Sequence, residues 1–151
     1  MSQSLTRVVI HLTYSTKHRA HFLKDENIRR RLESYSGGIL RDTECPPIRI
    51  RSVSDHIHLL FGLGKKIAIA DAVKEVKTGT SEWLKEVDDS LLRFYWQGGY
   101  AAFSVSEDRV PEVARYIDRQ DEHHKAVSFQ DELRALLRAH GVEFDERYLW
   151  D

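Results

Sequence analysis

The stretch SDHIHLLFG, residues 54–62, places two histidines in a run that is otherwise apolar. A short apolar run of this kind is typical of a buried strand. Side chains two residues apart on a strand point to the same face, with α-carbons about 6.6 Å apart. His56 and His58 are therefore predicted to share one face, while Ile57 turns with Leu59 to the opposite face and supplies the core.

Three further segments have the composition of strands. Residues 6–16, TRVVIHLTYST, are rich in β-branched and aromatic residues, and residues 48–54, IRIRSVS, alternate in polarity. Residues 48–54 lie just before residues 56–64, which contain the two histidines, so these two segments are predicted to pair as a hairpin. Residues 94–106, FYWQGGYAAFSVS, are aromatic with a break at Gly98–Gly99, and they predict one or two strands.

Apolar residues at helical spacing predict four helices. The helices are predicted over residues 25–40, 69–87, 108–125 and 129–140. Ser106 and Ser128 are the predicted N-caps of the third and fourth helices, and Gly141 ends the fourth. The resulting order is strand, helix, strand, strand, helix, strand, helix, helix. It predicts an α+β fold, a ferredoxin-like α/β sandwich with an antiparallel sheet and helices mainly on one face.

The composition narrows the class of protein. The length predicts a single domain over residues 1–151, and Cys45, the single cysteine, excludes a disulfide framework and a cysteine-based zinc site. No stretch approaches the roughly 20 apolar residues of a membrane span, and the N-terminus lacks the apolar core of a signal peptide. We therefore expect a cytoplasmic protein with no membrane partner. The net charge of −1 argues against a large basic surface that coats duplex DNA.

The histidine pair on the strand suggests a metal site. Two imidazoles on one strand face can lean toward one divalent cation, although a third ligand must then come from elsewhere. A second interpretation stays open at this point, namely two partly exposed histidines on an open face of the sheet. The short pattern His56-Ile57-His58 does not decide between them.

The predicted third helix carries a polar stripe. Tyr116 and Gln120 are four residues apart and so lie on one helical face, with His123 and His124 near the same face. A core helix would place Leu or Ile at such positions. The stripe indicates either a site or a face exposed to solvent.

Together the two elements predict one chemistry. A divalent metal held by His56, His58 and the amide oxygen of Gln120 would keep open positions for the oxygens of a phosphodiester. Tyr116, one helical turn away, would be the nucleophile. Its phosphotyrosine ester would retain the bond energy needed to rejoin the strand. The pattern therefore indicates a strand transferase for nucleic acid rather than a simple hydrolase.

The same residues carry a resemblance to a known family. His56-Ile57-His58 matches the HUH signature, a histidine pair around one bulky apolar residue, and a helical tyrosine followed four residues later by glutamine matches its partner motif. The chain resembles the single-tyrosine HUH transposases of small bacterial insertion sequences and the related REP-associated tyrosine transposases. The resemblance includes the segments YSTKHRAHF, DHIHLLFGL, YWQGGYAAFSVS and YIDRQDEHHK.

The resemblance implies a mechanism and partners. Such enzymes cut single-stranded DNA at element ends with the help of hairpins, form a covalent 5′-phosphotyrosine, use Mg²⁺ or Mn²⁺ and need no organic cofactor. They act as homodimers on nucleoid DNA in the bacterial cytoplasm, and the tyrosine helix often completes the site of the partner. Carried over to this chain, His56, His58 and Gln120 are the metal ligands and Tyr116 is the nucleophile.

Four further residues are predicted to contact nucleic acid. Arg49 and Arg51 share a strand face and could line a phosphate track, although a solvated face is an equal alternative. His123 and His124 are predicted only to contact phosphate or metal. Two other functions stay open: a domesticated relative that binds or nicks hairpin DNA without moving, and a ferredoxin-like module that binds a small ligand without catalysis.

Overall fold

The computed structural model describes residues 2–151, so Met1, which the predicted domain includes, lies outside the described residues. The strands are Val9–Ser15 (β1), Pro47–Ser52 (β2), His56–Gly62 (β3) and Ala101–Val105 (β4). The α-helices are Glu26–Asp42 (α1), Ile69–Val87 (α2), Val110–Asp118 (α3), Gln120–His123 (α4) and Phe129–Ala139 (α5). Short 3₁₀ turns span Lys17–Arg19 (η1), Asp89–Leu91 (η2) and Glu107–Arg109 (η3). Across residues 2–151, no helix is both long and apolar enough to cross a membrane.

The strands form one sheet in the order β2-β3-β1-β4, and the paired neighbours are antiparallel. The chain runs from β1 through α1, β2, β3 and α2 to β4, which is the ferredoxin-like succession of elements. The predicted α+β class, with its antiparallel sheet, is therefore confirmed. The 48–54 and 56–64 segments pair as the predicted hairpin, with Ser52 opposite Ile57.

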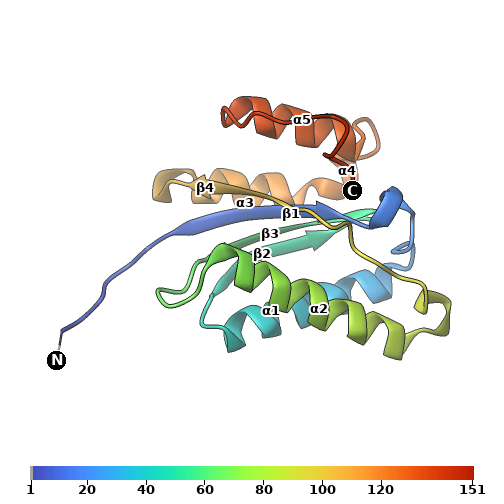
Figure 1. The fold of residues 1–151 in the computed structure, drawn as a ribbon, viewed down its shortest axis with the longest axis horizontal. Coiled ribbons are helices and arrows are strands. Elements are labelled where there is room, and N and C mark those ends of the chain that lie inside the picture. The colour runs from blue at the N-terminus through green and yellow to red at the C-terminus, as the bar shows by residue number, and fades with distance from the viewer. Residues whose placement is uncertain (1) are drawn as a thin grey trace.

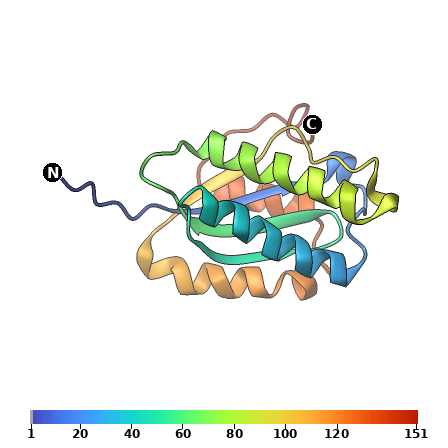
Figure 2. The ribbon, with the colours of Figure 1, turned by 90° about the horizontal axis from the view of Figure 1, so that it is seen from below.

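Helices cover both faces of the sheet. The two longest helices, α1 and α2, lie side by side under one face and are seen in front of the sheet in Figure 2. The predicted placement of helices mainly on one face describes these two helices only. The shorter α3, α4 and α5 lie over the opposite face in Figure 1. The second layer of helices encloses side chains that would otherwise face solvent.

Every second residue of β1 and β3 points into the core that lies between the sheet and helices α1 and α2. The fully buried side chains from these strands are Leu12, Tyr14, Ile57, Leu59 and Phe61. His56 and His58 point away from this core, as alternation predicts, and both have 0% exposure because α3 to α5 cover them. The interpretation of two exposed histidines on an open face is therefore wrong.

The predicted continuous helix over residues 108–125 is broken. After the η3 turn, α3 ends at Asp118, and Arg119 adopts φ −97° and ψ 15° before α4 begins at Gln120. The Arg119 amide bonds to the carbonyl of Tyr116, three residues earlier, as in a tightened last helical turn. Tyr116 and Gln120 therefore do not share one uninterrupted helix. The break lets the fully buried Gln120 side chain meet α5.

The segment 94–106 forms one strand, β4, and an isolated bridge between Trp96 and Thr16. The predicted break at Gly98 and Gly99 separates them. Both glycine amides donate to the carbonyl oxygen of Asp151, at 2.8 and 3.2 Å. These bonds tie the C-terminal tail to the end of the sheet that carries β4.

Candidate active site

The buried histidines lie on two neighbouring strands. In the antiparallel pairing of β1 with β3, Ser15 is opposite His56 and Thr13 is opposite His58. Alternation brings His11 of β1 to the same face. Three imidazoles therefore project from the sheet into the space beneath α3, α4 and α5.

The neighbours of His56 determine which of its two ring nitrogens carries the hydrogen. Its Nδ1 lies 2.7 Å from Oδ1 of Asp55, and an ionised carboxylate only accepts, so Nδ1 carries the hydrogen. The opposite nitrogen, Nε2, is buried without a hydrogen-bond partner and lies 3.5 Å from Oε1 of Glu132. Burial disfavours a charged imidazole, but the carboxylates of Asp55 and Glu132 raise the pKa of His56 above its usual value.

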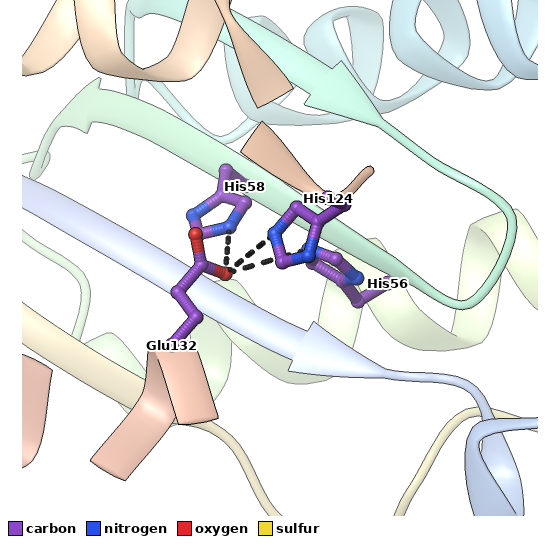
Figure 3. Close-up of side chains that lie close together, drawn as sticks. All are labelled: His56, His58, His124 and Glu132. Atoms are coloured by element: carbon purple, nitrogen blue, oxygen red, sulfur yellow. Dashed lines mark hydrogen bonds and ion pairs between the residues drawn. The ribbon is translucent and has the colours of Figure 1, made fainter. Parts of the chain in front are cut away.

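His124, just after α4, has the same arrangement. Its Nδ1 lies 2.6 Å from the carbonyl oxygen of Val127, which can only accept a hydrogen bond, so Nδ1 again carries the hydrogen. Nε2 is buried and lies 3.1 Å from Oε1 of Glu132 (Figure 3). In the neutral imidazole this nitrogen turns a lone pair toward a carboxylate oxygen. That contact is favourable only when a cation or a proton lies between the two atoms.

His58 contacts the same carboxylate oxygen, Oε1 of Glu132. Its Nε2 lies 2.9 Å from Oε1 of Glu132, and its Nδ1 lies 2.8 Å from Nε2 of His11. Burial lowers the pKa of His11 to about 3, so that imidazole is neutral near physiological pH. His11 can therefore accept at Nε2 a hydrogen bond from Nδ1–H of His58, which leaves the lone pair on Nε2 of His58 turned toward the cluster.

Glu132 of α5 is the centre of the cluster, and the sequence analysis missed it. The residue is 3% exposed and lies on the apolar face of α5, between Phe129 and Leu133. Burial alone would raise the pKa of its carboxyl group, but the nearby imidazoles of His58 and His124 hold that pKa far below its usual range. An acidic residue on the apolar stripe of a short helix was the signal that could have revealed it.

The second oxygen of Glu132 holds the predicted nucleophile. Tyr116 donates its hydroxyl hydrogen to Oε2, and Nε2 of Gln120 donates to the same atom at 3.1 Å. Burial and the negative charge of Glu132 raise the pKa of Tyr116 above its usual value, so the hydroxyl stays protonated. The amide oxygen Oε1 of Gln120 is buried and has no hydrogen-bond partner.

The donor set fits a divalent cation. Single donor atoms of His56, His58, His124 and Glu132 lie within 4.8 Å of one another. Atoms about 2.0–2.2 Å from a shared cation lie about 2.8–3.6 Å apart in octahedral or tetrahedral geometry. The three imidazole nitrogens lie 2.9, 3.1 and 3.5 Å from Oε1 of Glu132, within that interval. A carboxylate or carbonyl that holds Nδ1–H is also the usual support of a metal-binding histidine.

The fold brings His56, His58, Tyr116 and Gln120 together, as the sequence pattern predicted. Gln120 as third ligand stays a prediction, since its amide nitrogen faces Glu132. A half-turn of the amide group would exchange its oxygen and nitrogen.

The remaining predicted residues lie at different distances from the cluster. Nε2 of His123 is 3.4 Å from Oε2 of Glu132, at the edge of the cluster, where the side chain is 32% exposed. Arg49 pairs with Asp118 at 3.1 Å, and Arg51 pairs with Asp121 at 2.5 Å. These ion pairs partly neutralise both arginines. Their contact with nucleic acid stays a prediction.

The model of the family described as IS200-like transposases matches residues 4–120 of this chain. The chain belongs to this transposase family. The matched segment of this IS200-like transposase includes His56, His58, Tyr116 and Gln120, whereas His124 and Glu132 lie beyond its end. No curated protein matches the chain significantly.

Two solved structures have a similar fold. One is a provisionally assigned transposase from Deinococcus radiodurans R1, with 21% identity and a TM-score of 0.61, covering 80% of this chain and 98% of that chain. The other is the REP-associated tyrosine transposase bound to a REP hairpin, with 14% identity and a TM-score of 0.59, covering 84% of this chain and 76% of that chain. At these identities the likeness concerns the fold.

Proposed function

We propose that this IS200-like transposase cleaves and rejoins single-stranded DNA through a covalent 5′-phosphotyrosine on Tyr116. The observation that carries the proposal is the position of the Tyr116 hydroxyl. It shares one carboxylate with three imidazole nitrogens that suit a divalent cation. A nucleophile beside a Lewis-acid site is the arrangement that phosphodiester transfer requires.

The bond changes follow from this arrangement. The Tyr116 oxygen attacks phosphorus and loses its proton, the bond from phosphorus to the 3′ oxygen breaks, and the departing 3′ oxygen takes up a proton to give a free 3′-OH. The phosphotyrosine ester conserves the bond energy, so attack by another 3′-OH reverses the step, rejoins DNA and returns the proton to Tyr116.

The metal site in this proposal is formed by His56, His58, His124 and Glu132, with Gln120 as a further ligand. A bound Mg²⁺ or Mn²⁺ would supply Lewis-acid activation of the phosphodiester there. Asp55 and the carbonyl of Val127 orient two of the imidazoles through their Nδ1–H groups. Glu132 additionally orients the Tyr116 hydroxyl through Oε2.

The proposed substrate is single-stranded DNA that carries hairpins. The related REP-associated enzyme was solved bound to a REP hairpin, which supports this choice. We further propose that the protein acts as a homodimer, in which the tyrosine helix serves its own site or that of the partner.

A covalent-adduct assay tests the proposal. Labelled single-stranded DNA from the flanks of the reading frame, with its hairpins, is incubated with the protein and Mn²⁺ and then denatured. We expect an adduct with the native chain and none with Tyr116→Phe or His56→Ala. His140→Ala, which removes an exposed histidine outside the cluster, is the matched control and should retain the adduct.

The other outcomes have distinct meanings. An adduct that persists in Tyr116→Phe excludes Tyr116 as nucleophile. Cleavage without rejoining supports a domesticated relative that no longer moves its element. Absence of binding to both divalent metal and single-stranded DNA supports the non-catalytic ligand-binding module.

A further inference from the structure

A cavity of about 450 Å³ lies beside the candidate metal centre. One wall is the η1 loop with His18, Arg19 and His21, and another is the turn that contains Asp55. The first residues of α5 and the His124 side chain complete it. We call this cavity, with the walls formed by residues 18, 19, 21, 53–55, 124 and 127–130, the basic loop pocket.

The pocket is predominantly basic or neutral. Three of its side chains are imidazoles, one is a guanidinium, and Asp55 is the only acidic residue among those that line it. Asp55 is already paired with His56, at 2.7 Å. The first turn of α5 also faces the pocket, and the N-terminal end of a helix attracts negative charge. These features together favour an anion.

Arg19 has a charge without a partner. Within residues 2–151 no carboxylate lies at ion-pair distance from it, whereas Arg49 and Arg51 are both paired. Its Nη1 is buried and makes no hydrogen bond, and the guanidinium packs over the Trp150 ring at 5.5 Å. A buried donor without an acceptor costs free energy unless a ligand supplies the acceptor.

The backbone of the η1 loop is strained. His18 and Arg19 have φ values of 58° and 54°, in the left-handed region that residues with side chains rarely adopt. Two such residues in succession are energetically unfavourable unless the surrounding structure holds them. Backbone bonds on either side hold the loop in place, from Lys17 to Tyr95 at 2.8 Å and from Arg19 to Thr16 at 3.0 Å. Strain held in this way commonly marks a binding site.

We propose that the basic loop pocket binds a backbone phosphate of the single strand, next to the phosphodiester that is cleaved. The site rests on the proposed function, because His124 belongs both to the pocket and to the metal centre. A strand whose scissile phosphate lies at the metal centre therefore passes into the pocket. Arg19 supplies the charge-assisted hydrogen bonds to the neighbouring phosphate.

Salt-dependent binding of an oligonucleotide tests the pocket without any cleavage. Fluorescence anisotropy would measure the affinity of metal-free protein in EDTA for a labelled oligothymidylate of eight nucleotides, over a series of KCl concentrations. We expect Arg19→Gln to weaken binding about tenfold, as loss of one charged hydrogen-bonding group implies. The slope of log affinity against log salt should fall by about 0.7, the value for one phosphate contact on a single strand.

Arg31→Gln is the matched control. Arg31 also packs over a tryptophan, Trp83, at 5.4 Å, but it lies on α1 and outside the pocket. We expect its affinity and salt slope to equal those of the native chain. If Arg19→Gln leaves affinity and slope unchanged, or if Arg31→Gln lowers both equally, the pocket is not a phosphate site.

A second measurement distinguishes a free phosphate from a DNA phosphate. Titration of ¹⁵N-labelled protein with inorganic phosphate and with the oligothymidylate would follow the amide resonances of Phe129 and Gln130. We expect the oligonucleotide to shift both amides at concentrations far below those that inorganic phosphate needs, and to lose this effect in Arg19→Gln. A response to inorganic phosphate alone would overturn the assignment to DNA. Neither readout depends on Tyr116 or on a metal, so failure here is separate from failure in the adduct assay.

Discussion

Tyr116 of α3 donates its hydroxyl hydrogen to Glu132 of α5, a residue 16 positions further along the chain. The other oxygen of the same carboxylate faces the nitrogens of His56, His58 and His124. One side chain thus connects the nucleophile to the candidate metal ligands. Any substitution of Glu132 is therefore expected to affect both.

Glu132→Gln is expected to weaken Mn²⁺ binding by at least about tenfold, because the only carboxylate among the four donors is lost. Isothermal titration of the purified protein with Mn²⁺ would measure this. Glu122→Gln, the same change at an exposed position of α4, should leave the affinity unchanged. Equal affinities for the native chain and Glu132→Gln would exclude Glu132 as a ligand.

The two adjacent histidines after Gln120 are expected to differ. His124→Gln should weaken Mn²⁺ binding by about tenfold or more, because Nε2 of His124 turns directly toward Oε1 of Glu132. His123→Gln should change it far less, since that side chain lies at the edge of the cluster and is 32% exposed. The same titration compares them, and a larger loss for His123→Gln would contradict the arrangement.

The stability of the metal-free protein should depend on His11 below neutral pH. Burial lowers the pKa of His11 to about 3, from 6.5 in the unfolded chain. Between these values the unfolded chain binds a proton that the folded chain does not. The free energy of unfolding therefore falls as the pH falls, by up to about 1.4 kcal/mol per pH unit for this one group.

His11→Gln removes the titrating imidazole but keeps an acceptor for Nδ1–H of His58. We expect its free energy of unfolding to vary less steeply than that of the native chain between about pH 5 and 6.5. Urea denaturation in EDTA at several pH values would measure both slopes. Parallel curves would mean that His11 is not the group held neutral by burial.

Two glycines are predicted to respond oppositely to replacement by alanine. A Cβ on Gly38, inside α1, meets no atom within 4 Å, so Gly38→Ala should stabilise the protein by about 0.5–1 kcal/mol. A Cβ on Gly64 would lie 2.9 Å from the carbonyl oxygen of Glu44, so Gly64→Ala should destabilise it by about 1–3 kcal/mol. Thermal denaturation compares the pair, and stabilisation by Gly64→Ala would contradict the close approach.

Local patterns were sufficient for much of the fold. Alternation in β3 correctly separates Ile57, in the core, from His56 and His58, on the opposite face. Periodicity located α1 and α2, because a long amphipathic helix repeats its apolar positions many times. The break at Arg119 was not predictable in the same way, since the polar stripe from Tyr116 to Gln120 is compatible with a continuous helix.

The candidate site also contains some features that local sequence predicts and others that depend on tertiary packing. Residue types and spacing predicted His56, His58, Tyr116 and Gln120 as candidate site residues, because the members of each pair lie only two or four positions apart in the sequence. Arg49 and Arg51 also share a strand by spacing. Their pairing with Asp118 and Asp121 depends on how α3 and α4 pack beside β2.

The order of elements, the shared face of the two histidines and the candidate nucleophile could all be predicted from local sequence, because each depends on residues only a few positions apart. The position of Glu132 between the histidines and Tyr116 depends on tertiary packing. The contact of His58 with Glu132 spans 74 positions of sequence and arises when α5 folds over the sheet. A carboxylate so distant leaves no local pattern except its place on an apolar helical face. Its role comes from the packing of that helix against the sheet.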